Sequence, residues 1–327
     1  MDSFIQSIAR GFDLKCVKSK VYKDKFGHIC ATTSGLVRIQ RGSGRRGQVG
    51  MSHDNEVNAI IFQHEIKEHL HESGFTVDRL LISSQNVPYY SSDEGVYTAS
   101  LVLNEQNADY ADNTAFLGII AHIAKMHNAL RDTNIATRHV TSAGNSNNIA
   151  KLQDDMKTLR KKLLKTAKFS DFDMLFLRGY DTFAPHIIDF NDENPSGHIC
   201  HNLLKEENIY KQNSNGNSHI AITNFSEASN RHQLHDLAYI LKRYIKAKPQ
   251  GSTPDIMPIS RIVDEYAQNC SIPLDDALLR RILLYPDKLV KVVLDYYSKK
   301  RSFAPNTYIT RMQECLRVGA ILSEGLL

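Results

Sequence analysis

The hydrophobic pattern of the chain changes once, near Asn104, and this change constrains the fold more than any other feature. Before it, short apolar or β-branched runs at 30–33, 36–40 and 96–103 stand between turn residues. Such runs are typical of strands. After it, apolar residues recur every three or four positions, as in 115–130, which is typical of helices. The sequence therefore predicts an α+β chain in which strands come first and helices follow.

The part before Asn104 predicts a small domain over residues 1–104. A further strand is expected at 80–83, and one helix at 57–72 carries Phe62, Ile66 and Leu70 on one face. Residues 41–50, RGSGRRGQVG, form a glycine-rich basic loop. The polar segment that follows Asn104 is typical of a hinge, so residues 105–327 are expected to form a larger, mostly helical domain.

A β-hairpin is expected within the helical part. The dipeptide Asn215-Gly216 is a strong hairpin turn signal, and it predicts strands at 208–210 and 219–225. The surrounding sequence has helical periodicity, and one helix, 151–165, carries a basic face. The other expected helices are 234–245, 259–269, 274–284, 287–297 and 307–322.

Composition excludes several classes of protein. The chain has 327 residues, 42% of them hydrophobic, which is enough for two domains with cores and excludes a disordered chain. A net charge of +4 gives no indication of nucleic-acid binding. The five cysteines are scattered without C-x-x-C spacing, so no zinc ribbon is expected. The most apolar stretch, 116–126, is shorter than a membrane span, so we expect no membrane insertion.

Several motifs resemble those of known kinases. ICHNLLKEENIY (199–210) resembles the H-x-D-x-x-x-x-N loop of aminoglycoside-phosphotransferase-like kinases, and ITNFSEA (222–228) resembles their metal-binding I-D-F segment. HDLAYILKRYI (235–245) is similar to the helix that follows. LLYPDKLVKVVLDYYSKKRSF (283–303) resembles the closing helices of the CotS family of bacterial spore-coat proteins. The resemblance implies a protein-kinase-like two-lobed fold, with a small β-rich N-lobe and a large helical C-lobe.

The chain departs from this kinase pattern at the positions that carry chemistry. Leu203 stands at the catalytic aspartate, Asn224 at the hairpin metal-binding aspartate and Arg38 at the strand lysine. His201 and Asn208 keep the residue types of the loop. Leucine has no acceptor for a hydroxyl proton, and a positioned acid–base group contributes about 10²–10⁴-fold to a rate. We therefore expect no catalytic residue, with His201 packing under the hairpin and Leu203 filling the vacated pocket.

The remaining candidates concern phosphate and metal binding. The resemblance places the helix glutamate that steadies the strand cation at Glu65, with Glu68 as the other register. Arg38 and Glu65 would then be a vestige of a nucleotide site, or a structural ion pair. Asn208 and Asn224 are weak candidates for a metal site, because both are neutral and Mg²⁺ in kinase sites usually has an anionic ligand. Glu227, three residues after Asn224, could replace the lost carboxylate, but we expect a solvated turn glutamate there, so it is a weak candidate too.

We interpret the chain as a catalytically inactive, kinase-like protein of the bacterial spore coat, with a structural or binding role and no cofactor. Its partners would be other spore-coat proteins. It would be made in the mother-cell cytoplasm and deposited on the spore coat. One alternative is an active ATP-dependent small-molecule phosphotransferase that needs Mg²⁺, with Glu227 or Glu207 as a rearranged metal ligand. Another is a polyanion-binding protein that uses 41–46 and the basic face at 157–162.

Overall fold

The structure, a computed structural model, divides the chain into two compact units that are described separately below. The first unit comprises Met1–Asp109, His122–Thr141 and Ser196–Asn230, and the second comprises Tyr110–Ala121, Ser142–Pro195 and Arg231–Leu327. The residues that the structure describes are 2–23, 27–42, 52–103, 106–131, 133–135, 149–187, 198–214, 217–249, 255–298 and 305–325.

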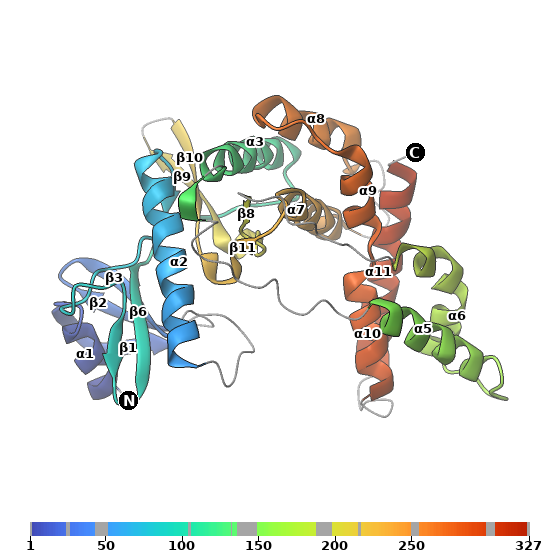
Figure 1. The fold of residues 1–327 in the computed structure, drawn as a ribbon, viewed down its shortest axis with the longest axis horizontal. Coiled ribbons are helices and arrows are strands. Elements are labelled where there is room, and N and C mark those ends of the chain that lie inside the picture. The colour runs from blue at the N-terminus through green and yellow to red at the C-terminus, as the bar shows by residue number, and fades with distance from the viewer. Residues whose placement is uncertain are drawn as a thin grey trace. The chain divides into compact units, whose positions relative to one another are not determined.

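The first unit is built on a five-stranded antiparallel sheet in the order β1-β2-β3-β6-β5. Helices α1 and α2 lie on opposite sides of this sheet (Figure 1). The elements are α1 (Asp2–Arg10), β1 (Cys16–Lys23), β2 (His28–Thr32), β3 (Gly35–Arg41), α2 (His53–Glu72), β5 (Tyr90–Ser92) and β6 (Gly95–Leu101).

Strand alternation decides which side chains reach each helix. Val37 and Ile39 of β3 are fully buried in the core that α1 covers. Because successive side chains of a strand point to opposite faces, Arg38 points to the face that α2 covers. Ser100 of β6 lies opposite Arg38 in the sheet register and belongs to the same face. Arg38 of the sheet therefore lies beneath α2, where it lines a cavity with Gln63 and Lys67.

A second, four-stranded sheet completes the first unit in the order β4-β10-β9-β7. Its centre is the expected hairpin, whose turn residues lie outside the described part of the chain. Strand β4 runs parallel to β10. The short strands β8 and β11 pair with each other and stand before and after the hairpin in sequence. The bounds are β4 (Thr76–Val77), β7 (Gln106–Asn107), β8 (Ile199–Cys200), β9 (Ile209–Ser214), β10 (Asn217–Ile222) and β11 (Ser229–Asn230), with 3-10 turns η2 (Glu206–Asn208) and η3 (Phe225–Glu227).

The strand expected at 80–83 is wrong. Only Leu80 makes a bridge, to Ser100, and the chain then turns, because the Ser83 N–H and hydroxyl both donate to the Val87 carbonyl. The adjoining strand is β5, a few residues later. Asn86 takes a left-handed conformation in this turn, which asparagine tolerates better than most residues.

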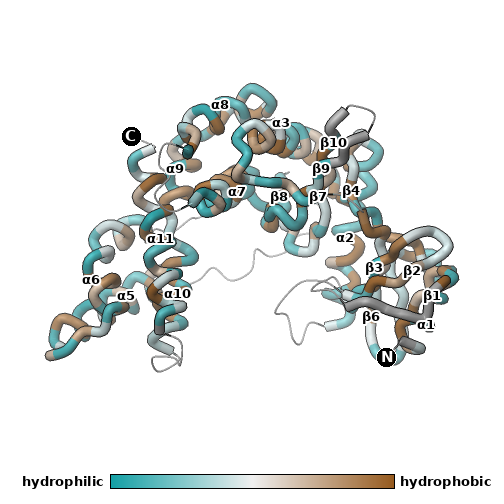
Figure 2. The backbone as a smooth tube through the Cα atoms, turned by 180° about the vertical axis from the view of Figure 1, so that it is seen from behind, coloured by the Kyte–Doolittle hydropathy of each residue, from teal (hydrophilic) through white to brown (hydrophobic). Residues whose placement is uncertain are grey.

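The second unit is helical, and aromatic residues fill its core. Phe172 stacks on Tyr296 at 3.9 Å between ring centroids, and Phe176 packs edge-on against Tyr180. In Figure 2 its helices alternate between teal and brown, as expected of amphipathic helices. The helices are α5 (Ile149–Leu163), α6 (Asp171–Phe183), η1 (Ala184–His186), α7 (Leu234–Ala247), α8 (Ile259–Asn269), α9 (Asp276–Leu284), α10 (Asp287–Ser298) and α11 (Pro305–Gly325), and α3 (Asn113–Leu130) is shared with the first unit.

Helix α6 and helix α1 were not expected from the sequence. Ser170 begins α6 with a capping box, in which its hydroxyl accepts from the Asp173 N–H and the Asp173 carboxylate accepts from the Ser170 N–H. In the described part of the chain, no helix is long and apolar enough to cross a bilayer.

Candidate functional site

The kinase-like motif positions gather around one small cavity that lies wholly in the first unit. Arg38 from β3, Lys67 from α2 and Asp78 from the segment after β4 line it, together with Asn208 and Asn224. Its volume is about 20 Å³, which is room for about one water. The structure thus brings together four sequence-predicted positions, Arg38, Glu207, Asn208 and Asn224, and two that sequence reasoning missed, Lys67 and Asp78.

A buried ion pair lies at the centre of this site. The Lys67 Nζ is 3.2 Å from the Asp78 Oδ1, and the two side chains are only 3% and 9% exposed. Lys67 is buried because it follows Ile66 on the inner face of α2, one turn after Gln63, which lines the same cavity. Charged side chains are almost never buried unless they are paired. The pair therefore satisfies both charges inside the protein.

Asn224 is held against this ion pair. Its backbone N–H donates to the Asp78 Oδ1 at 3.2 Å, and its side-chain amide donates to the Asn208 Oδ1 at 3.4 Å. Asn224 has φ +62° and ψ +64°, a left-handed conformation that asparagine and aspartate adopt most readily after glycine. The backbone thus accepts asparagine here without unusual strain, and its amide bonds to a second amide.

The loop that contains His201 and Asn208 is held by hydrogen bonds between these two side chains and main-chain atoms. The Asn208 side-chain amide donates to the Leu203 carbonyl at 2.8 Å, and the Leu203 N–H donates to the His201 Nδ1 at 3.1 Å. Because Nδ1 accepts, the proton of this fully buried imidazole lies on Nε2, which donates to the Thr223 carbonyl at 2.9 Å. His201 therefore ties the loop to the strand end that precedes Asn224.

Leu203 contributes to this arrangement through its backbone. Its side chain is half-buried, whereas the neighbouring Leu204 is fully buried in the core. Neither leucine lines the cavity, so the expectation that Leu203 fills a vacated pocket stays a prediction. No acceptor stands on the Leu203 side chain, so this position cannot orient or deprotonate a hydroxyl group.

The carboxylates near the site do not form a metal centre. Glu207 lines the cavity, with its Oε1 3.9 Å from the Lys205 Nζ, while Glu227 does not line it. The main-chain carbonyl of Glu227 accepts from the Asn202 side chain at 3.0 Å. Within the described ranges, no three His, Cys, Asp or Glu side chains cluster as a metal site would require. Mg²⁺ binding here would therefore have to compete with the Lys67 ammonium for Asp78 and with the bond between the two amides.

Neither position predicted for the helix glutamate, Glu65 or Glu68, lines the cavity. The α2 residues that line the cavity with Arg38 are Gln63 and Lys67, and Glu65 is not among them. Glu68 accepts from Arg79, with its Oε1 2.8 Å from the arginine Nε. This hydrogen bond lowers the pKa of Glu68 below its ordinary value. The role of Arg38 and Glu65 as a nucleotide-site vestige stays a prediction.

The polyanion alternative rests on residues that the structure describes only in part. Residues 43–46 of the basic loop lie outside the described ranges. On α5, Arg160 donates to Asp181 at 3.0 Å and lies over the Tyr180 ring, while Lys157, Lys161 and Lys162 are exposed. One of the four basic residues therefore serves packing between α5 and α6.

No protein-family model and no curated protein sequence matches this chain. Solved structures do match its fold along almost the whole length. An aminoglycoside phosphotransferase from Alicyclobacillus acidocaldarius has a TM-score of 0.73 at 16% identity, over 98% of this chain and 94% of that one. A spectinomycin phosphotransferase in complex with ADP and spectinomycin has a TM-score of 0.63 at 12% identity, over 98% of both chains.

A third match is an amicoumacin kinase in complex with AMP-PNP and Ca²⁺, with a TM-score of 0.60 at 14% identity, over 96% of this chain and 92% of that one. Identities this low establish the fold alone. The fold is kinase-like. The predicted α+β class, with a β-rich N-terminal sheet and a helical C-terminal part, is thereby confirmed.

We predict that the Lys67–Asp78 pair behaves as a coupled unit. Lys67→Met or Asp78→Asn alone should lower the free energy of unfolding by about 3–5 kcal/mol, because each leaves one buried charge without its partner. The double variant should recover most of that loss. Urea denaturation of the four proteins gives the coupling free energy.

The neighbouring surface pair supplies the control. Glu68→Gln removes the ion pair with Arg79, whose side chain is 48% exposed, and should cost less than about 1 kcal/mol. A double variant no more stable than the single ones would contradict the assignment of Lys67 and Asp78 as partners.

Proposed function

We propose that this protein is a kinase-like protein that does not transfer phosphoryl groups, and that it acts as a structural or binding component of a bacterial spore coat. The observation that supports the absence of phosphoryl transfer is the set of contacts made by the Asp78 carboxylate. The acid nearest Asn224 is held by the Lys67 ammonium at 3.2 Å and by the Asn224 N–H at 3.2 Å. Both contacts are made to the Asp78 Oδ1, so a divalent cation that binds this carboxylate would have to compete with the Lys67 ammonium.

The catalytic position supports the same proposal. Leu203 offers no side-chain acceptor, and the loop is held by the contacts of His201 and Asn208 with the Leu203 main chain. A site that lacks an acid–base group and a free anionic metal ligand has lost two of the parts that phosphoryl transfer uses. The loop is folded without an acidic side chain at Leu203, because the His201 and Asn208 side chains bond to the main chain of that residue.

The spore-coat half of the proposal rests on the resemblance of residues 283–303 to the CotS family. Under this proposal the protein is made in the mother-cell cytoplasm and deposited on the forespore, with other coat proteins as partners.

A second candidate is an active ATP-dependent phosphotransferase. One observation favours it, because Asp78 places a carboxylate beside Asn224 that the motif comparison did not include. The solved structures with this fold include phosphotransferases bound to nucleotides. In this candidate Lys67 would have to release Asp78 when Mg²⁺ binds.

We predict no saturable MgATP binding. Isothermal titration and a thermal-shift series with MgATP, MgADP and metal-free ATP should show no Kd below about 1 mM and no rise in Tm. A micromolar Kd with the rise in Tm that ligand linkage requires would support the phosphotransferase instead.

Restoring the two acids should not restore a kinase site. Asn224→Asp replaces the amide donor to Asn208 with a carboxylate beside Asp78, so it should lower the free energy of unfolding by about 1–3 kcal/mol. Adding Leu203→Asp should lower it further, and Mg²⁺ should not reverse the loss. Denaturation with and without Mg²⁺ measures both effects.

Asn86→Asp is the matched control, because Asn86 has nearly the same left-handed φ, +61°, in an exposed turn. It should be nearly neutral. Stabilisation of the Leu203→Asp, Asn224→Asp double variant by Mg²⁺ would show a near-intact kinase site.

The coat role predicts a location. In a spore-forming bacterium that encodes this chain, a fluorescent fusion should collect as a shell around the forespore. A fusion that is intact by immunoblot but stays diffuse in the mother cell throughout sporulation would contradict the coat role and leave the MgATP result unaffected.

A further inference from the structure

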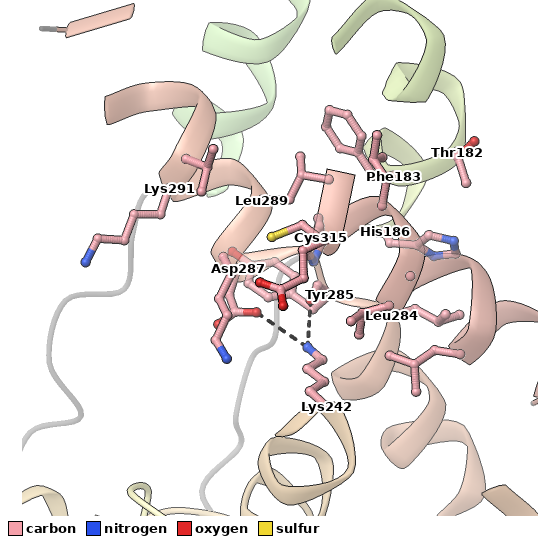
Figure 3. Close-up of a pocket in the computed structure, with 18 of the residues that line it drawn as sticks. Thr182, Phe183, His186, Lys242, Leu284, Tyr285, Asp287, Leu289, Lys291 and Cys315 are labelled. Atoms are coloured by element: carbon pink, nitrogen blue, oxygen red, sulfur yellow. Dashed lines mark hydrogen bonds and ion pairs between the residues drawn. The ribbon is translucent and has the colours of Figure 1, made fainter. Parts of the chain in front are cut away.

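The helical unit contains a cavity that the proposed function does not use. It lies between the end of α6, helix α7, the turn from α9 to α10, and α11 (Figure 3). All of its lining residues belong to the second unit. Its volume is about 290 Å³, near the lower end of small-molecule sites, which start at roughly 300 Å³. A water takes about 30 Å³, so the cavity has room for about ten non-hydrogen atoms.

The wall of this cavity is mainly apolar. Phe183 closes it from α6, Leu284 and Leu289 line the turn between α9 and α10, and Leu316 and Leu322 line it from α11. Figure 3 shows Phe183, Leu289 and the Cys315 thiol around the same space. Cys315 is half-buried, and burial raises the pKa of its thiol to about 11. An occupant of this wall must therefore present an apolar body.

The charged residues around the cavity have a positive excess. Five cationic and three anionic side chains line it, which leaves two positive charges uncompensated. The cations are Lys242, Lys246, Lys288, Lys291 and Arg311, and the anions are Asp287, Asp295 and Glu314.

Two of these cations pair with anions of the wall, and a third, Lys288, places its Nζ over the Tyr239 ring, 5.3 Å from the centroid. The Lys246 Nζ is 2.6 Å from the Glu314 Oε2, and the Lys242 Nζ donates to the Tyr285 carbonyl at 2.9 Å and to Asp287 (Figure 3). Desolvation lowers the pKa of the Lys288 ammonium, the neighbouring Asp287 raises it, and repulsion from nearby Arg243 and Lys242 lowers it further. An anion at this edge would relieve that repulsion.

One glycine leaves the cavity open from α11. A Cβ built on Gly319 would meet no atom within 4 Å, so the packing of the chain itself does not require glycine there. Glycine inside a helix costs about 1 kcal/mol relative to alanine. Gly319 is therefore a position at which a side chain can fill the cavity without displacing its walls.

We propose that this cavity binds a small amphipathic anion, with an apolar body of about eight to ten non-hydrogen atoms and one anionic group. The apolar body lies against Leu284, Leu289 and Leu316. The anionic group lies at the edge that carries Lys288 and the other cations. This site does not depend on whether the protein binds nucleotide.

Octanoate is the probe that tests the site, with octylammonium and 1-octanol as probes of the same length and different charge. Each is titrated into the full-length protein while N-ethylmaleimide alkylation of Cys315 is followed by peptide mass spectrometry. Octanoate should slow alkylation of Cys315 saturably, with a Kd below about 1 mM, and should raise Tm. Cys16 and Cys270, which do not line the cavity, report any general effect of the probes.

Two helical glycines give a matched pair of variants. Gly319→Leu fills the cavity and should abolish the protection of Cys315 by octanoate. Gly118→Leu makes the same change in α3, where a Cβ also meets nothing within 4 Å and where no cavity wall is formed, and should keep the protection. Lys288→Gln, at an exposed position, should weaken octanoate binding several-fold even where Gly319→Leu does not fold.

The outcomes separate the parts of the proposal. Absence of saturable protection by octanoate overturns the site. Protection that is equal or stronger with octylammonium or 1-octanol overturns the anionic class. Protection that survives in a folded Gly319→Leu protein places the binding elsewhere and overturns the cavity.

Discussion

The buried ion pair between Lys67 and Asp78 is the interaction on which the first unit depends. Lys67 comes from α2, and Asp78 follows β4, which pairs in parallel with β10. The same carboxylate accepts the N–H of Asn224, the residue at which the chain leaves the hairpin. One buried acid therefore connects the helix over the large sheet with the hairpin that carries the motif positions. Burying two charges gives little net stability, but leaving either one alone costs several kcal/mol.

The ion pair also changes the chemistry that these positions offer to a metal ion. A divalent cation here would have to compete for oxygens that already accept, because the Asn208 Oδ1 accepts from the Asn224 amide and the Asp78 Oδ1 accepts from the Asn224 N–H and the Lys67 ammonium. The loop nevertheless keeps its shape with leucine at the aspartate position. Its shape depends on the main-chain N–H and carbonyl of Leu203, which any residue except proline supplies.

The parts of the fold that the sequence predicts well are those set by neighbouring residues. The hairpin follows from Asn215-Gly216, and the helices α2, α3 and α5, with those after the hairpin, follow from apolar spacing. Helix α6 could also have been found, because Ser170 and Asp173 form a capping box ahead of the apolar positions Phe172, Phe176 and Tyr180. The strand at 80–83 was wrong because its apolar run ends in the turn at Ser83.

The candidate site was predictable only in part. His201, Asn208 and Asn224 stand in a motif with fixed spacing, so the sequence alone locates them. Lys67 and Asp78 carry no such signal, since a lysine in a helix and an aspartate after a short strand are usually solvated. Their burial follows from the packing of α2 on β4 and on the turn after β10, which are far apart in sequence. Pairings of this kind follow from tertiary structure and leave no periodic pattern.

The helical cavity has its own local origin in the way α9 ends. Pro286 lacks a backbone N–H and fixes its φ angle, so it begins a new helix, and α10 starts at the next residue. The carbonyls of Ile282 and Tyr285, left without helical partners, accept from the Lys242 ammonium at 3.2 and 2.9 Å. The Lys242 ammonium thereby stabilises the turn between α9 and α10, and Leu284 and Leu289 on either side of this turn line the cavity. The segment that resembles the CotS family thus supplies both the core contact of Leu289 and the charged rim around it. A segment that packs Leu289 into the core therefore also lines the cavity.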